Sequence, residues 1–410
     1  MSTAVAHPMI VPMPRLVPLA GHALRFVALA RLRAGWVGGR VDVTMPSGEI
    51  VRLGGAGPAE AHVTIHDDRF WLRLLLRGEL GCGESFVAGE WSSDDVVAAI
   101  RVFLRGTGAR GVESPLSRLG SLRALALHRR AANTPAGSAR NIHAHYDLGN
   151  AFYRLFLDDE TLAYSCGVFD GEPRELADAQ RAKLDRLCAQ LALTPHDHLL
   201  EIGCGWGGMA IHAARTRGCR VTAITVSREQ QALAHQRVVG AGLADRVDIQ
   251  FRDYRDLTGS FDKIVSIEML EAVGYEYLPQ YFAICARLLA PGGRLAIQTI
   301  TMPDARFAAY RRRVDWMQTY IFPGSLIPSI GAIRAASPQL ELRDARDIGP
   351  DYAPTLRAWR TRFLAALPAV RALGFDEPFI RTWLLYLAFS EAAFTERTLG
   401  DHQLLFTCRA

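Results

Sequence analysis

The sequence predicts a doubly wound α/β domain with a mostly parallel sheet, preceded by a smaller N-terminal α+β domain. The stretch LLEIGCGWGG, residues 199–208, joins a strand pattern to a helical pattern through a glycine-rich turn. Strand and helix patterns then alternate over residues 220–300, which is typical of a parallel sheet that binds its ligand at the carboxyl ends of the strands. A length of 410 residues is sufficient for two domains with full cores.

The first elements predict the small α+β domain. After a start broken by prolines, an amphipathic helix is expected over Leu19–Leu32, and Pro46–Gly48 marks a hairpin between two strand-like runs. Residues 61–104 predict a strand, a helix, a glycine-rich turn and a second helix capped by Ser92 or Ser93. The helix Leu19–Leu32 could lie on a membrane surface or pack on its own domain.

The expected domain boundaries are 1–126 for the N-terminal domain, 127–140 for a linker rich in Arg, Pro, Gly and Ser, and 141–410 for the second domain. The second domain's expected elements are helix Glu175–Ala192, strand Leu199–Ile202, strand Arg220–Thr225, helix Ser227–Gly240, strand Val247–Phe251, strand Asp262–Ile267, helix Tyr277–Leu289, strand Arg294–Ile300 and, after an insertion over 301–338, strands Leu340–Ile348 and His402–Cys408.

Composition excludes several classes of protein. Hydrophobic residues make up 49% of the chain, but no run approaches the roughly twenty apolar residues that span a bilayer, and we expect a cytoplasmic protein. The seven cysteines have neither disulfide-like nor metal-binding spacing, so reduced thiols and no metal are expected. Residues 1–140 carry 17 basic and 11 acidic side chains, a net charge of +6. This part could face anionic lipid or be a solvated basic surface, and no motif points to nucleic acid.

The position of the acidic residue distinguishes between two cofactors. A nicotinamide site needs an acid at the end of the second strand, and Arg220–Thr225 ends without one. Glu201 instead lies inside the first strand, just before Gly203 and Gly205, an arrangement typical of S-adenosylmethionine (SAM) methyltransferases. SAM is therefore favoured over NAD, and a purely structural turn is the alternative.

A series of motifs in fixed order resembles the cyclopropane-fatty-acyl-phospholipid synthases, a branch of the class I SAM methyltransferases. The motifs are NIHAHYDLGN, AYSCGVF, LLEIGCGWGG, ITVSREQ, RDYRDL, EMLEAVG, QTIT, YIFPG and DYAPTLRAW, together with GESFVAGEW in the N-terminal domain. The resemblance covers nearly the whole chain. It implies a seven-stranded class I sheet and a C-methyltransferase that acts on the double bond of an unsaturated acyl chain in membrane phospholipid.

The resemblance also implies a set of cofactor-binding residues. Glu201 belongs to this set. Tyr164 and Ser165 would cover the methionine part of SAM, and Gly203 and Gly205 would lie beneath it. Thr225, Val226 and Gln230 would hold the ribose, and Asp253 and Tyr254 would flank the adenine. Most of these residues follow a strand, where a doubly wound fold binds its ligand.

For catalysis the resemblance implies a bound bicarbonate that serves as the base. Cys166, through its backbone amide, Glu271 and Tyr352 match three of its ligands, but Gln298 stands where the family has a histidine. Glutamine cannot carry charge, so the bicarbonate should be loosened or shifted. Ser390, at a position that is often cysteine in the family, argues against a thiol-based covalent step.

Two products remain open from the sequence. A cyclopropane is expected from the resemblance. The alternative is a methylene branch that a partner reductase converts to a methyl branch, because Gln298, and Ala272 beside Glu271, change the surroundings of the base. Rival hypotheses are a methyltransferase for a small soluble acceptor and a lipid-binding module with a vestigial SAM turn. The resemblance further implies a homodimer formed through the N-terminal domain.

Overall fold

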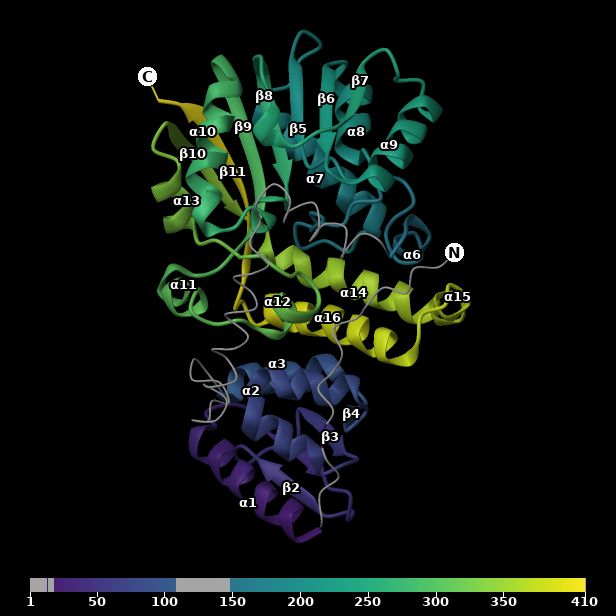
Figure 1. Cartoon of the computed structure of the whole chain (residues 1–410), viewed down its shortest axis with the longest axis vertical. Coiled ribbons are helices and arrows are strands. Elements are labelled where there is room, and N and C mark those ends of the chain that lie inside the picture. The colour runs from purple at the N-terminus through teal and green to yellow at the C-terminus, as the bar shows by residue number, and fades with distance from the viewer. Residues whose placement is uncertain (1–12, 14–17, 108–147, 410) are drawn as a thin grey trace. The chain divides into compact units, whose positions relative to one another are not determined.

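The computed structural model describes residue 13, residues 18–107 and residues 148–409 (Figure 1). These residues divide into two compact units. The first unit contains the described residues up to 107 together with 310–323 and 367–396, and the second contains 148–309, 324–366 and 397–409. The expected linker at 127–140 lies outside the described residues, as do His143 and His145 of the NIHAHYDLGN motif.

The second unit is built on a sheet that has seven strands among the described residues, in the order β10-β11-β9-β8-β5-β6-β7. Strands β5, β6, β7, β8 and β9 pair in parallel, and β11 runs antiparallel to both β9 and β10. The bounds are β5 (His198–Ile202), β6 (Arg220–Thr225), β7 (Val247–Phe251), β8 (Phe261–Ile267), β9 (Leu289–Thr301), β10 (Leu340–Asp347) and β11 (Gly400–Cys408). This arrangement confirms the predicted doubly wound, mostly parallel, class I sheet.

Alternate residues of the same strands supply two hydrophobic cores, one on each face of this sheet. Leu200 of β5 packs in a cluster with α10 (Leu278–Leu288) and α13 (Ile330–Ala336), whereas Leu199 packs in a cluster with α7 (Leu176–Leu191), α8 (Gly208–Arg217) and α9 (Arg228–Gly240). A strand that is apolar at consecutive positions is covered on both faces, as β5 is here. The sheet is thus the middle layer of this unit (Figure 1).

The remaining elements of the second unit lie near the carboxyl ends of the parallel strands or connect them. They are α6 (Asn150–Tyr153), the short 3₁₀ helices η2 (Tyr254–Asp256), η3 (Leu270–Ala272) and η4 (Tyr275–Tyr277), α11 (Asp304–Tyr310) and α14 (Gly349–Ala365). Most predicted bounds agree with the structure to within two residues. Strand β9 begins five residues earlier than predicted. Pro291–Gly293 lies within the strand, where its pairing with β8 shifts register.

The first unit combines a small sheet with helices from distant parts of the chain. Its strands, among the described residues, are ordered β2-β1-β3-β4, and β1 and β2 form the predicted hairpin. The bounds are α1 (Pro18–Gly35), β1 (Val41–Thr44), β2 (Ile50–Leu53), β3 (Ala61–Ile65), α2 (Arg69–Val87), β4 (Trp91–Ser93), α3 (Val96–Thr107), α12 (Trp316–Tyr320), α15 (Leu367–Ala372) and α16 (Glu377–Thr395).

Two local predictions for this unit were wrong. The glycine-rich stretch expected to be a turn is the second half of α2, which tolerates it through a kink at Gly78, where φ is 58° and ψ is −133°. The cap of α3 is Asp95, whose carboxylate accepts a hydrogen bond of 3.0 Å from the Ala98 amide, in place of Ser92 or Ser93.

Within the described ranges, no helix is long and apolar enough to cross a membrane.

Candidate active site

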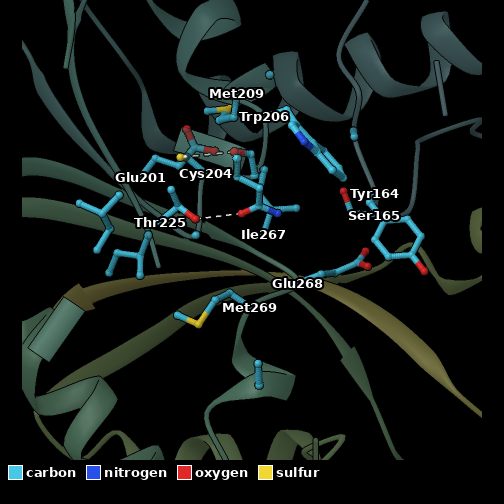
Figure 2. A pocket seen from close by; sticks show the side chains of 18 of the residues that line it. Tyr164, Ser165, Glu201, Cys204, Trp206, Met209, Thr225, Ile267, Glu268 and Met269 are labelled. Atoms are coloured by element: carbon cyan, nitrogen blue, oxygen red, sulfur yellow. Dashed lines mark hydrogen bonds between the residues drawn. The ribbon is translucent and has the colours of Figure 1, made fainter. Parts of the chain in front are cut away.

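A pocket opens in the second unit where β5, β6 and β8 end, and Figure 2 shows the side chains around it. It is lined by all ten residues that the sequence analysis assigned to the cofactor: Tyr164, Ser165, Glu201, Gly203, Gly205, Thr225, Val226, Gln230, Asp253 and Tyr254. Lys183, Trp206, Arg255, Glu268 and Met269 line it as well. Parallel strands place their carboxyl ends at one edge of a sheet, which explains why segments far apart in sequence meet here.

The glycine turn forms the floor of the pocket. Gly203 and Gly205 both adopt positive φ, 83° and 51°, a conformation that most side chains disfavour. A Cβ atom on Gly203 would lie 2.9 Å from Cγ of Met269, whereas one on Gly205 would enter open space. The amides of Gly203 and Cys204 both donate to the Ile224 carbonyl oxygen, at 3.0 and 2.9 Å, and tie the turn to β6. The chain therefore leaves room for a ligand directly above the turn.

Glu201 presents a buried carboxylate to this space. The residue is 3% exposed, and among the described residues its Oε2 atom has no hydrogen-bond partner. Burial raises the pKa of Glu201 to about 8. A buried carboxylate oxygen without a partner is costly, so a ligand with a positively charged or hydrogen-bonding group would stabilise it.

Polar side chains after β6 and β7 form the next part of the wall. The Thr225 hydroxyl contacts the Gln230 amide oxygen at 2.8 Å and accepts from the Ser227 amide at 3.1 Å. Asp253 is fixed by Arg255, whose guanidinium lies 2.7 Å from it and 5.3 Å from the centre of the Tyr254 ring. These groups are held in place by contacts with one another and need not be ordered by a ligand.

An aromatic group lies on the other side of the pocket. Tyr164 contacts Trp359 of α14, with 5.3 Å between ring centres, and Tyr153 at the same distance. Beside it, the fully buried Lys183 donates a 2.6 Å hydrogen bond to the Ser165 hydroxyl. Burial lowers the pKa of Lys183.

Four residues were predicted to be catalytic: Cys166, Glu271, Gln298 and Tyr352. They are not among the residues that line the pocket, and three of them contact a different residue, Glu268. The Cys166 amide and the Gln298 side-chain amide donate to Glu268 Oε1 at 2.8 and 2.9 Å, and the Tyr352 hydroxyl donates to Oε2 at 2.6 Å. Tyr352 is in the first turn of α14. Figure 2 shows Glu268 extending toward Tyr164 and Ser165.

Glu271 has separate contacts. Its Oε1 atom accepts hydrogen bonds from the Thr299 hydroxyl, at 2.9 Å, and from the Ile300 amide, while Oε2 is buried without a partner within the described part of the chain. Burial, and secondly the negative charge of Glu268, raises the pKa of Glu271 to about 8. A third acid, Asp401 of β11, is fully buried and lies 3.2 Å from the Gln298 side-chain amide.

Glu268 and Lys183 were not predicted from the sequence. Glu268 directly follows β8, a position that faces the ligand in this fold, and this placement was the available signal. Among the aromatic residues of the chain's second half, Trp359 lies beside the pocket, whereas Tyr281 and Phe282 are core residues. Trp316 and Tyr320 belong to the first unit, as does Ser390.

The chemistry of the pocket lining suits SAM. The open space above Gly205 admits a ligand close to the backbone, and the unsatisfied Glu201 carboxylate suits the ammonium group or hydroxyls of SAM. The pocket lies at the amino end of α8, whose first residue, Gly208, lines it.

Comparison with known proteins gives a consistent result. The model of the family described as mycolic acid cyclopropane synthetase matches residues 134–404. Tuberculostearic acid methyltransferase UfaA1 of Mycobacterium tuberculosis is 44% identical over 85% of this chain and 84% of its own length. The cyclopropane-fatty-acyl-phospholipid synthase of Escherichia coli is 35% identical over 87% and 90%, respectively.

Solved structures agree. A mycolic acid cyclopropane synthase, CmaA1, in complex with SAH and CTAB, superposes with a TM-score of 0.60 at 29% identity, covering 65% of this chain and 97% of that one. The cyclopropane synthase MmaA2 from Mycobacterium tuberculosis superposes with the same TM-score at 28% identity, and covers the same shares of the two chains.

Proposed function

Since the chain belongs to the mycolic acid cyclopropane synthetase family and is a SAM-dependent methyltransferase, we propose that it methylates the double bond of an unsaturated acyl chain in a membrane phospholipid. SAM supplies the methyl group as an electrophile. The residues of the pocket bind and orient it, and the acyl double bond must approach from the side of Tyr164, Ser165 and Glu268.

The observation that carries this proposal is the carboxylate of Glu268 at the wall of the SAM pocket. Methylation of an alkene leaves a carbocation, which must lose a proton to a base inside a site that excludes water. Methylation of an amine or a hydroxyl leaves no carbocation. A carboxylate with its own set of hydrogen-bond donors therefore favours an alkene acceptor over a small soluble amine or alcohol.

The aromatic group beside the pocket has a matching role. The Tyr164 ring contacts the rings of Trp359 and Tyr153, and the π face of an aromatic ring attracts a cation. We infer that they stabilise the carbocation and limit the access of water. The SAM sulfonium would benefit from the same rings.

For the product, the comparison with relatives favours the methylene-branched chain over the cyclopropane. The relative at 44% identity is named for tuberculostearic acid, a methyl-branched fatty acid, whereas the relative named as a cyclopropane synthase is 35% identical. We propose that this enzyme forms a methylene branch and that a separate reductase reduces it to a methyl branch. Gln298 is consistent with this proposal because it alters the group next to the base.

The test uses the purified full-length protein, SAM labelled in its methyl group, and liposomes of oleoyl phospholipid. Mass spectrometry should show acyl chains with one additional labelled carbon. Proton NMR of the methyl esters separates the two products, because a methylene branch has vinylidene protons and a cyclopropane has strongly shielded ring protons. Labelled chains with ring protons only would support methyl transfer and overturn the proposed product, and unlabelled chains would overturn the proposed reaction.

A further inference from the structure

Glu268 occupies the position that the sequence analysis assigned to a bound anion. The family resemblance implies a bicarbonate held by Cys166, Glu271 and Tyr352, with Gln298 in place of a histidine. In the structure, the Cys166 backbone amide, the Gln298 side-chain amide and the Tyr352 hydroxyl all donate to the Glu268 carboxylate, at 2.6–2.9 Å. A carboxylate and a bicarbonate present the same pair of oxygens to such donors.

We propose that Glu268 is the catalytic base of this enzyme, and that its carboxylate does the work of a bound bicarbonate, which the enzyme does not require. The inference rests on the proposed methylation of an acyl double bond. It makes the base a covalent part of the chain, present at any concentration of dissolved carbon dioxide.

The residues present do not fit a bicarbonate in addition to Glu268. Both Glu268 oxygens already accept hydrogen bonds from the donors that would hold the anion. A second anion at this place would lose those donors and lie against the carboxylate, and like charges in a site of low dielectric repel strongly.

The backbone at Glu268 supports a functional role. Its φ angle is 48°, in the left-handed region that favours glycine, and its amide donates to the Gln298 carbonyl oxygen at 2.7 Å. A non-glycine residue in this conformation costs on the order of 1 kcal/mol. Such a cost is retained where the side chain has a use. The strained conformation directs the side chain into the pocket, at the end of β8.

The neighbouring groups hold the Glu268 carboxylate in place. Three hydrogen bonds from donors fix its two oxygens. Burial, and secondly the charge of Glu268, raises the pKa of Asp401 well above its usual range. Lys183 is a buried basic group on the other side. Of Glu268, Glu271 and Asp401, Glu268 is thus the one that lines the pocket, where it can take a proton from the acyl chain.

The reaction balances as follows. The double bond donates its electron pair to the SAM methyl carbon, the carbon–sulfur bond breaks, SAH forms, and a cation remains on the neighbouring acyl carbon. For a methylene branch, hydrogen migrates with its electron pair from the methylated carbon to the cation. Glu268 then takes a proton from the new methyl group, and the C–H electrons become the new double bond. For a cyclopropane, the same proton leaves without the migration and the electrons close the ring. No oxidant or reductant is needed.

The experiment compares the enzyme in buffer depleted of carbon dioxide with the enzyme in added bicarbonate. Wild type should methylate oleoyl liposomes at equal rates in both. Glu268→Gln should lower the rate about 10²- to 10⁴-fold, the usual contribution of a general base. Glu276→Gln, on an exposed position of the same connection, removes the same charge and should leave the rate unchanged.

Glu268→Gly gives the decisive measurement, because glycine suits the backbone there and the deletion empties the space between the three donors. Bicarbonate should restore part of its activity and raise its melting temperature, and should leave the melting temperature of wild type unchanged. The melting measurement needs no activity.

Three results would overturn the proposal: dependence of the wild type on bicarbonate, an unimpaired Glu268→Gln variant, or a Glu268→Gly variant that bicarbonate neither reactivates nor stabilises. A wild type that methylates no acyl chain in either buffer would instead refute the proposed function, and the melting measurement would still show whether the donors bind the anion.

Discussion

At the scale of single residues, Glu201 couples the stability of the protein to pH. Its pKa in the folded protein is about 8, raised by burial from an ordinary value near 4.5. The folded state therefore binds this proton more tightly than the unfolded state. The contribution of Glu201 to stability is complete below about pH 4.5 and is lost progressively as the pH rises toward 8.

We expect Glu201→Gln to be more stable than wild type at high pH in the absence of SAM. The difference in the free energy of unfolding should be on the order of 2–4 kcal/mol near pH 8.5 and should shrink toward zero near pH 4.5, as measured by denaturant titration. Calorimetry should show at least about tenfold weaker binding of SAM, because the amide lacks the negative charge. Equal SAM affinity would contradict the assignment of Glu201 to the cofactor.

Gln298 lies between Glu268, the proposed base, and the buried acid Asp401. Its side-chain amide donates to Glu268 and Asp401, and its oxygen accepts from Gln403 at 3.0 Å. Gln298→His places an imidazole that can become cationic beside Glu268. A cationic imidazole would form an ion pair with the Glu268 carboxylate, and an ion-paired carboxylate is less ready to take a proton from the acyl chain.

For Gln298→His we therefore predict about a tenfold lower rate of methyl transfer, equivalent to about 1.4 kcal/mol in the barrier, and a changed ratio of methylene to cyclopropane product. Product analysis of methyl esters by NMR measures both. A variant with the rate and the product of wild type would show that this position does not steer proton loss.

Much of the cofactor site could be predicted at the level of residues, and the catalytic centre less so. The glycine turn is a local feature, and the ten residues that the turn and the family resemblance assigned to the cofactor all line the pocket. The role of Glu268 depends on donors from three distant segments, at Cys166, Gln298 and Tyr352, which meet only in the folded chain. No local pattern distinguishes Glu268 from Glu271, three positions later.

At the scale of elements, a glycine in the turn from β5 to α8 can be compared with a glycine outside the pocket. The comparison distinguishes the effect of backbone strain from the effect on ligand binding. Gly205 and Gly242 both have positive φ, 51° and 69°, and a Cβ atom on either would meet nothing within 4 Å. Gly205 lines the pocket, whereas Gly242 follows α9 outside it.

Gly205→Ala and Gly242→Ala should each lose about 1 kcal/mol of stability, because alanine disfavours this conformation. Only Gly205→Ala should bind SAM more weakly, since its methyl group enters the pocket. Thermal unfolding and calorimetry on the two variants test this directly. If both variants bound SAM as wild type does, Gly205 would not approach the cofactor.

Element boundaries were predictable where the pattern of apolar residues was regular, as in β6 and β7, whose bounds agree with the prediction. The prediction was wrong where glycines interrupt a helix. In α2, Gly83 contacts the Trp316 ring so closely that a Cβ atom would lie 2.4 Å from it, so these glycines serve packing and not a turn. A single sequence does not reveal a packing partner more than 200 positions away.

At the scale of the whole molecule, the grouping of segments was the least predictable feature. Residues 310–323 and 367–396 follow the SAM motifs in sequence, yet they belong to the unit built on α1, α2 and α3. Side-chain contacts hold them there: the Tyr320 hydroxyl donates to Glu84 at 2.6 Å, and Arg381 donates to the Phe86 carbonyl oxygen at 2.7 Å. Such contacts leave no periodic trace in the sequence.

The first unit also carries the surface that we propose meets the membrane. Helix α1 buries Ala28, Leu29 and Leu32 against its own unit, which answers the question of whether it packs there. The same unit exposes Phe26 to 75% and Val37 to 78%. Residues 1–140 have a net charge of +6, most of it contributed by residues 108–140, and α1 itself exposes Arg31 and Arg33.

We predict that the protein binds vesicles containing anionic phospholipid, and that binding weakens as salt screens the charges. Phe26→Asp combined with Val37→Asp should reduce binding in a vesicle sedimentation assay by about tenfold or more, because each change removes an apolar contact and adds repulsion from the lipid.

Val239→Asp is the control, since Val239 is 53% exposed in α9 of the other unit and its substitution should leave binding unchanged. Methylation of an acyl chain dissolved in detergent micelles should be the same in all three proteins. Equal loss of vesicle binding in the control would assign the effect to net charge alone, and binding that persists in the double variant at every salt concentration would show that this surface does not meet the lipid.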